Sequence, residues 1–152
     1  MSLAQKLQEL NITLPAPPKP VGSYRPAVRT GTLVFTSGQL PVREGQLLAT
    51  GKVPADVPLP QAAESARQAV LNALAAVAAE ADLEKVSRVV RLNVFVNSSS
   101  GFTNQAQVAN GASDLLVALF GEPGRHTRCA IGVAELPLNA PVELDLVVEI
   151  AE

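Results

Sequence analysis

The sequence has few of the residues that equip several specialised classes of protein. Among its 152 residues there is one cysteine, Cys129, so no disulfide can form within the chain. This excludes the small secreted folds that depend on disulfides and favours a reducing compartment. Aromatic residues amount to 3% and tryptophan is absent. Because single-stranded nucleic acids are commonly bound by stacking on aromatic side chains, this composition does not favour such a partner.

Charged residues are also scarce, at 17%, and the formal net charge is −2. Binding to polyanions is driven by a basic surface, so we do not expect a nucleic acid as a partner. No apolar run reaches the ~18 residues that span a bilayer, and the start of the chain lacks the pattern of a signal peptide. We therefore expect a cytoplasmic protein without a membrane contact.

Aliphatic side chains are abundant. Hydrophobic residues make up 47% of the chain, which is enough for one domain with its own core. Residues 1–20 are expected to form a helix from Ser2 to Leu10, with Ser2 as its N-cap, and then a proline-rich connector. Residues 21–152 are expected to form the domain. A PxxP ligand for another protein is the alternative interpretation of the connector.

Hydrophobic periodicity predicts elements in the order β-β-β-α-β-α-β-β. Helices are expected at 61–81 and 105–120. Because two helices cover only one face of such a sheet, the prediction is an α+β fold with a mixed sheet and both helices on one face. The strands are expected at 26–29, 33–37, 46–49, 86–96, 127–134 and 142–150.

The uncovered face of this sheet is expected to be unusual. The short linker 135–141 between the last two strands predicts that they form an antiparallel pair. Strand alternation then places small, apolar and isolated charged residues on the uncovered face: Val89, Phe95, Arg128, Ala130, Gly132 and Val147. This mixture is not typical of a solvated surface, so we expect other subunits to cover it.

Most motifs that mark a catalytic or cofactor site are missing, including the P-loop, GxGxxG, HExxH and GxSxG. His126 is the only histidine, and no pair of cysteine or histidine residues has metal-ligand spacing. A Ser-His-Asp triad that uses His126 has no nucleophile motif to support it. Cys129 falls on the expected inward face of its strand, which favours an inert core thiol over a reactive one.

One pair of charges remains. Arg128 begins one strand and Glu143 begins its expected partner, both on the uncovered face. The first interpretation is an exposed cross-strand ion pair, which contributes well under ~1 kcal/mol. The second is a site in which Arg128 offers a planar fork to a substrate carboxylate and Glu143 holds or activates a water. The small neighbours Ala130 and Gly132 would leave room for the ligand.

At these residues the chain resembles a known family. The matching segments are Gly22-Ser23-Tyr24, Ser37-Gly38-Gln39-Leu40-Pro41, Arg128-Cys129-Ala130-Ile131-Gly132-Val133, and Leu136-Pro137 followed by Val142-Glu143-Leu144. Over residues 20–152 the sequence is similar to the Rid/YjgF family, also called L-PSP endoribonucleases or reactive intermediate deaminases. The resemblance implies a chorismate-mutase-like fold and a homotrimer with sites in the clefts between subunits.

The resemblance also implies an activity. Deaminating members hydrolyse 2-imino or 2-enamino acids to 2-oxo acids and ammonia, with no metal or organic cofactor. Arg128 matches the arginine that binds the substrate carboxylate, and Glu143 matches the glutamate near the hydrolytic water. The other residues expected to contact the substrate are Tyr24, Gly38, Asn110 and Cys129.

The chain departs from the best-understood branch of the family in three places. It has the extension 1–20 and a longer segment at 97–107, and Ala130 stands where a cysteine is frequent, with the cysteine at 129 instead. Two other functions therefore stay open beside the hydrolase. One is a non-catalytic protein that binds small carboxylates through Arg128. The other is a ribonuclease, which the isoelectric point of about 5.4 and the scarcity of aromatics disfavour.

Overall fold

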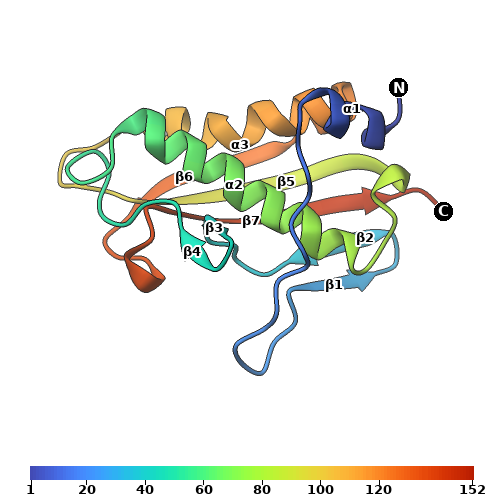
Figure 1. Cartoon of the computed structure of the whole chain (residues 1–152), viewed down its shortest axis with the longest axis horizontal. Coiled ribbons are helices and arrows are strands. Elements are labelled where there is room, and N and C mark those ends of the chain that lie inside the picture. Colours follow the sequence, from blue (N-terminus) through green and yellow to red (C-terminus); the bar gives the residue numbers. More distant parts are fainter.

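The computed structural model describes residues 1–152, and a five-stranded mixed sheet forms its centre (Figure 1). The strands lie in the order β1-β2-β7-β5-β6. Only β5 and β6 run parallel, and the other neighbours are antiparallel. A separate hairpin pairs β3 with β4. The bounds are Ala27–Thr30 for β1, Leu33–Thr36 for β2, Val42–Arg43 for β3, Gln46–Leu47 for β4, Val86–Asn97 for β5, Thr127–Val133 for β6 and Val142–Ile150 for β7.

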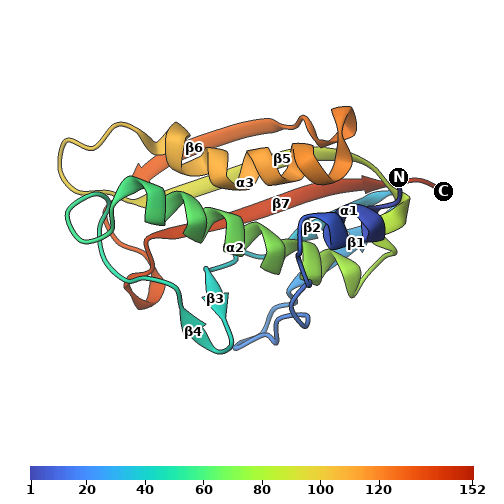
Figure 2. The same cartoon turned by 45° about the horizontal axis from the view of Figure 1, so that its top comes forward.

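Two long helices, α2 (Leu59–Ala78) and α3 (Gln105–Phe120), lie side by side over one face of this sheet (Figure 2). Their backbones are in close contact at Gly111, where a Cβ atom would collide with the carbonyl oxygen of Ala63. The many alanines of α2 keep that helix thin, so it packs closely against both α3 and the sheet. The predicted α+β fold, with both helices on one face of a mixed sheet, is confirmed.

The first residues of the chain form α1 (Leu3–Glu9), and the predicted N-cap at Ser2 is confirmed. Ser2 takes part in a capping box, which satisfies two backbone N–H groups at the start of the helix. The carboxylate of Glu84 accepts hydrogen bonds from the N–H groups of Leu3 and Ala4, at 3.0 and 2.9 Å. Because the side chain of Leu3 is also buried in the core, α1 is fastened to the rest of the structure.

One predicted strand pairing is wrong. β6 pairs with β5 in parallel, and β7 lies between β2 and β5, antiparallel to both. Helix α3 makes the crossover from β5 to β6 that parallel neighbours require. The linker 135–141 then crosses one intervening strand, a step of roughly 10 Å. Because this distance is short, the linker is no longer than one that joins two strands of a hairpin, and its length does not distinguish the two connections.

Because β6 pairs with β5, Arg128, Ala130 and Gly132 project from the face of the sheet opposite the predicted one. Arg128 lies in register with Leu92, which is fully buried beneath the helices. Residues that are in register on neighbouring strands share a face, so Arg128, Ala130 and Gly132 lie on the helix side of the sheet, at its edge. Their predicted place on the uncovered face is wrong.

The same correction applies to Val89, which is fully buried on the helix side. A bulge between Val89 and Arg91 shifts the alternation of β5 by one residue, and a pattern of single letters does not reveal such a bulge. Phe95 and Val147 do lie on the open face, as predicted, because their neighbours along each strand are buried beneath the helices.

The open face carries two rows of apolar side chains. Val28, Phe35 and Val147 are in register across β1, β2 and β7, and Phe95 and Ile131 are in register across β5 and β6. Phe35 is 43% exposed and Ile131 is 49% exposed. Aligned large apolar side chains on one exposed face mark an interaction surface. That other subunits cover this face stays a prediction.

The connections are short and well anchored. In the segment between β5 and α3, the N–H of Ser99 donates to the carbonyl oxygen of Val53 at 2.8 Å, and Gln105 Nε2 donates to the carbonyl oxygen of Phe102 at 2.8 Å. No helix has the combination of length and apolarity that crossing a membrane demands. Three 3₁₀ helices complete the structure: η1 (Leu83–Lys85), η2 (Glu122–Gly124) and η3 (Pro137–Asn139).

Candidate functional site

Arg128 is held at the edge of the sheet by two side chains of α3. Its Nη1 donates to Asn110 Oδ1 at 2.8 Å and to Ser113 Oγ at 3.1 Å. Asn110 and Ser113 are three residues apart and so lie on the same helix face. These two bonds use both hydrogens of Nη1, whereas Nε and Nη2 make no hydrogen bond to the protein. The guanidinium is therefore a positioned fork with free donors for an anion.

His126 continues this network. Its Nδ1 lies 2.7 Å from the carbonyl oxygen of Gly124, and its Nε2 lies 2.9 Å from Ser113 Oγ. A carbonyl only accepts, so Nδ1 carries a hydrogen, and in the neutral imidazole Nε2 accepts from the Ser113 hydroxyl. The hydrogen bonds then run in one direction from Arg128 through Ser113 and His126 to the backbone, an order in which each bond strengthens the next.

A small pocket of about 220 Å³ opens beside this network. Its charged lining includes two cations, Arg125 and Arg128, against one anion, Asp114. The volume is below the roughly 300–1,000 Å³ of sites that enclose drug-sized molecules, so it suits a small anion. The complete lining is Ser113, Asp114, Val117, Arg125, His126 and Arg128.

Glu143 lies elsewhere, on the open face of β7 and against Gly38. After β2 ends, Gln39 exchanges both backbone hydrogen bonds with Leu144, at 2.7 and 3.1 Å. This brings Gly38 beneath the carboxylate, and a Cβ atom at Gly38 would overlap with Glu143 Oε1. Glycine is therefore the residue that allows the carboxylate to lie this close to the backbone.

The electrostatic setting of Glu143 differs from that of an ordinary surface carboxylate. Partial burial raises the pKa of Glu143 above its ordinary value, and the nearby charge of Asp145 raises it further. Asp145 accepts a hydrogen bond from Asn93 Nδ2 at 2.9 Å, whereas no donor bonds to the side-chain carboxylate of Glu143. Glu143 is consequently a better proton acceptor than a free glutamate.

Within one chain, Arg128 and Glu143 do not meet. Glu143 is in register with Phe95 and Ile131, three residues beyond Arg128 and two strands away. Strand geometry then separates the two Cα atoms by about 14 Å, and the side chains project from opposite faces. The predicted cross-strand ion pair is therefore wrong. The two salt bridges of the structure are Lys52–Glu135 and Arg125–Glu122.

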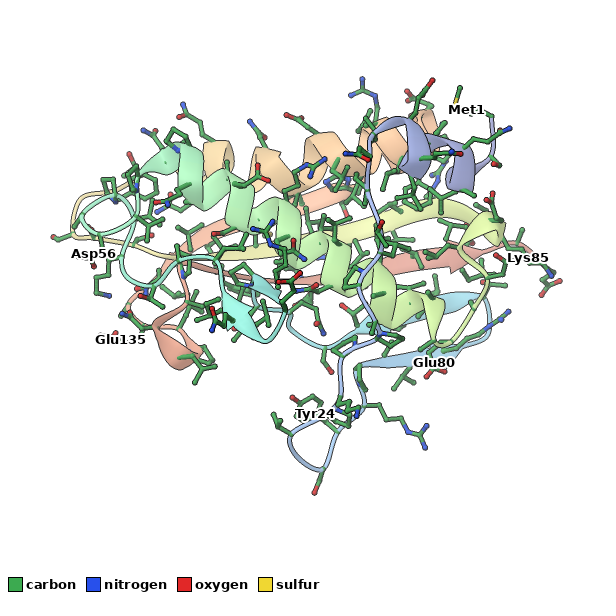
Figure 3. The ribbon with its side chains drawn as sticks, viewed as in Figure 1. Met1, Tyr24, Asp56, Glu80, Lys85 and Glu135 are labelled. Atoms are coloured by element: carbon green, nitrogen blue, oxygen red, sulfur yellow. The ribbon has the colours of Figure 1, made fainter.

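Tyr24 lies on a loop that projects beyond the sheet before β1, and this residue is 51% exposed (Figure 3). It lines a wide groove of about 870 Å³, together with Gly38, the proline-rich connector, the β3–β4 hairpin and α2. Tyr24 and Gly38 therefore line the same groove, whereas Asn110 is hydrogen-bonded to Arg128 at the other site.

The prediction that Cys129 points inward is wrong. It pairs with Asn93 on the open face and is exposed, because β6 takes its register from β5. Its Sγ accepts a hydrogen bond from Arg91 Nη2 at 3.2 Å. Cys129 thus lies among polar side chains of the open face, on the opposite side of the sheet from the Arg128 pocket.

Sequence reasoning missed Ser113 and considered His126 only as part of a triad. Ser113 and His126 are in contact, as a triad would require. However, His126 Nδ1 bonds to a backbone carbonyl oxygen where a triad has a carboxylate, and Ser113 Oγ accepts a hydrogen bond from Arg128. This is not the arrangement of a nucleophilic triad. No cluster of three or more His, Cys, Asp or Glu side chains is arranged to hold a metal ion. The three-residue spacing of Asn110 and Ser113 places both on one helix face, and this was the sequence feature that could have indicated Ser113.

The mixed sheet with two long helices packed on one face defines the chain as an α+β protein of the chorismate-mutase-like type. The sequence profile of the family described as Endoribonuclease L-PSP matches residues 14–150. The chain belongs to this family, which is the Rid/YjgF family that its motifs resemble.

Individual relatives agree with this assignment. The chain is 47% identical to Protein TCP17 of Trypanosoma cruzi, over 97% of this chain and 94% of that protein. It is 34% identical to a 2-iminobutanoate/2-iminopropanoate deaminase of Dermatophagoides farinae, over 91% of this chain and 94% of that protein. A crystal structure of a protein of unknown function from Agrobacterium tumefaciens superposes with a TM-score of 0.89 at 43% identity, covering 99% of this chain and 93% of that one.

Proposed function

We propose that the protein hydrolyses reactive 2-imino and 2-enamino acids to 2-oxo acids and ammonia. The observation that carries the proposal is the fixed guanidinium of Arg128, whose Nη1 is bound by Asn110 and Ser113 and whose remaining donors are free. The similarity to a 2-iminobutanoate/2-iminopropanoate deaminase supports the same reaction class.

Arg128 would bind the substrate carboxylate through two parallel N–H···O bonds. This contact positions the neighbouring C=N carbon and neutralises the only permanent charge of the substrate. Protonated imines are already electrophilic, so orientation and a positioned water supply most of what the reaction needs. No step requires a metal ion or an organic cofactor.

Glu143 would act as the proton carrier. The water oxygen bonds to the iminium carbon as Glu143 takes a water proton, which gives a carbinolamine. Glu143 then returns this proton to the nitrogen, and the carbon–nitrogen bond breaks as Glu143 takes the proton of the carbinolamine hydroxyl. This gives the 2-oxo acid and ammonia, and Glu143 passes its proton to the departing ammonia. A glutamate of raised pKa is suited to this alternation, because its basicity is closer to neutral pH.

Because Arg128 and Glu143 project from opposite faces of one sheet, we propose that the site forms between subunits. Arg128 and Asn110 would come from one subunit, and Glu143, Gly38 and Tyr24 from the next. The exposed apolar rows on the open face support a homotrimer with these faces inward. The expected protein partners are therefore further copies of this chain. The expected location remains the cytoplasm.

A non-catalytic carboxylate-binding protein is the second candidate. The Arg128 cluster is fully assembled within one chain, whereas Glu143 is not brought to it, and this favours binding without turnover if the subunits do not associate. The ribonuclease reaction has no comparable observation in its favour.

The test is ammonia release from 2-iminopropanoate and 2-iminobutanoate generated in situ. Release should be faster than the spontaneous reaction and should be inhibited by 2-oxobutyrate. Binding of 2-oxobutyrate by wild type without any acceleration would instead support the second candidate, and absence of both would contradict the two together.

A further inference from the structure

We propose that Ser113 and His126 are positioning residues, which lock the Arg128 guanidinium so that its Nε–Nη2 edge receives the ligand carboxylate. This inference rests on the proposed function, and it adds the mode of recognition and two further residues. It concerns only groups that lie within one chain.

The stereochemistry of the guanidinium carries the first step. A carboxylate can approach an arginine end-on, through Nη1 and Nη2, or side-on, through Nε and Nη2. Both hydrogens of Nη1 are already donated, to Asn110 at 2.8 Å and to Ser113 at 3.1 Å. The end-on approach would break one of these bonds, so the side-on edge is the one that remains for two parallel bonds.

The second step is what holds Ser113 in place. A serine hydroxyl rotates freely unless its hydrogen is engaged, and here His126 Nε2, at 2.9 Å, accepts it. His126 is fixed in turn through Nδ1 by the carbonyl oxygen of Gly124 at 2.7 Å. The lone pairs of Ser113 are thereby aimed at Arg128, so both residues act on the ligand through the guanidinium.

Protonation of His126 would change this arrangement in a defined way. Nε2 would then carry a hydrogen and donate to Ser113 Oγ, which would accept from both His126 and Arg128. The Ser113 hydroxyl hydrogen would be released toward the pocket, and a second positive charge would stand beside Arg128. Both effects favour a bound carboxylate, so protonation of the imidazole should raise the affinity.

Other charged groups around His126 come from each neighbouring element. Asp114 of α3, Arg125 after η2 and Arg128 of β6 line the same pocket, and Glu122 of η2 pairs with Arg125 at 3.1 Å. Asp114 and, in the proposed intersubunit site, Glu143 are the other groups whose protonation would alter binding. Asp114→Asn and Glu143→Gln are therefore the controls that must keep the pH response.

The experiment measures the Kd of 2-oxobutyrate by calorimetry at about pH 8 and about pH 6. For wild type we expect roughly three- to tenfold tighter binding at the lower pH. His126→Gln keeps an acceptor for Ser113 but does not titrate, so it should bind like wild type at the higher pH and lose the pH response.

Ser113→Ala releases one hydrogen of Nη1 and should weaken binding by about tenfold. Ser113→Thr, which restores a hydroxyl, should recover most of the affinity. In imine hydrolysis Ser113→Ala should raise KM and leave kcat nearly unchanged, because the carboxylate contact is made equally in the ground state and the transition state. Ser100→Ala, an exposed serine of the β5–α3 loop, is the matched control and should change nothing.

The outcomes separate the two proposals. If Arg128→Ala weakens binding strongly while Ser113→Ala behaves like Ser100→Ala and His126→Gln retains the pH response, the positioning roles are wrong and the proposed function stands. If wild type does not bind 2-oxobutyrate, both are wrong. If Ser113→Ala does not fold, as judged by circular dichroism, the pH response of His126→Gln decides the matter alone.

Discussion

Arg128 and Glu143 occupy contrasting surroundings on opposite faces of one sheet. Arg128 is bound by Asn110 and Ser113, in a network that ends on a backbone carbonyl. Glu143 has no hydrogen-bond donor, lies against a glycine backbone, and shares its strand face with a second carboxylate. One group is fixed in position and keeps its charge, and the other is placed where its charge is disfavoured.

This difference indicates two distinct tasks. A fixed cation with satisfied neighbours is suited to binding, since little reorganisation is needed when an anion arrives. A carboxylate that is partly desolvated and without donors is suited to exchanging a proton. The predictions below test whether binding and proton transfer separate in this way.

The largest effect is expected for Glu143→Gln on turnover. A neutral amide does not accept a proton from water, so kcat for imine hydrolysis should fall by about 10²–10⁴-fold. The Kd of 2-oxobutyrate should stay within a few-fold of wild type, because the carboxylate contact belongs to Arg128. Equal losses in binding and in turnover would remove the distinction between the two residues.

The next largest effect is expected for Arg128 on binding. Arg128→Ala should weaken 2-oxobutyrate by roughly 10–150-fold, which corresponds to a charge-assisted hydrogen bond of about 1.5–3 kcal/mol. Arg128→Lys keeps the charge and loses the planar fork, so its loss should be smaller. Calorimetry on both variants measures this order. Unchanged binding in Arg128→Ala, with the oligomer intact, would contradict the site assignment.

A smaller effect is expected for Gly38→Ala. The added methyl group would overlap with Glu143 Oε1, so the carboxylate must move away from its place above the backbone. We expect kcat to fall by about tenfold and the Kd of 2-oxobutyrate to change little. Gly31→Ala is unsuitable as its control because Gly31 has positive φ, but Ser100→Ala serves. A wild-type kcat in Gly38→Ala would show that the position of Glu143 is not critical.

The smallest effect concerns stability. Because folding raises the pKa of Glu143, the protonated form is favoured in the folded state, and this stabilisation is lost as the pH rises through the folded-state pKa. Glu143→Gln should therefore raise Tm at neutral pH, by at most about 2 °C because solvent screens the half-buried group. The gain should vanish in acid, below about pH 4. Thermal unfolding at several pH values measures it, and a lower Tm at neutral pH would contradict the raised pKa.

The long periodic elements were predictable because their signals are local. The predicted spans of α3 and of the last strand match the observed Gln105–Phe120 and Val142–Ile150. Pairing was not predictable, because a parallel neighbour depends on a crossover that the linker length does not reveal. The bulge after Val89 and the register of Arg128 were not predictable either, because each is set by contacts between residues far apart in the sequence.

The candidate site was predictable in its identities but not in its geometry. Arg128 and Glu143 stood out as charges in apolar strands beside small residues, and the family resemblance supplied Tyr24, Gly38 and Asn110. Ser113 and His126 were not found as partners of Arg128, because only the fold brings α3 to the start of β6.

A subunit-mixing experiment tests most directly whether one site combines Arg128 and Glu143 of different subunits. The Arg128→Ala and Glu143→Gln variants, each expected to have little activity alone, would be dissociated, mixed in equal amounts and reassembled. If each site takes Arg128 from one subunit and Glu143 from its neighbour, a random mixture should recover about a quarter of wild-type activity. If mixing restores no activity while the hybrid oligomers are shown to form, the intersubunit site is wrong.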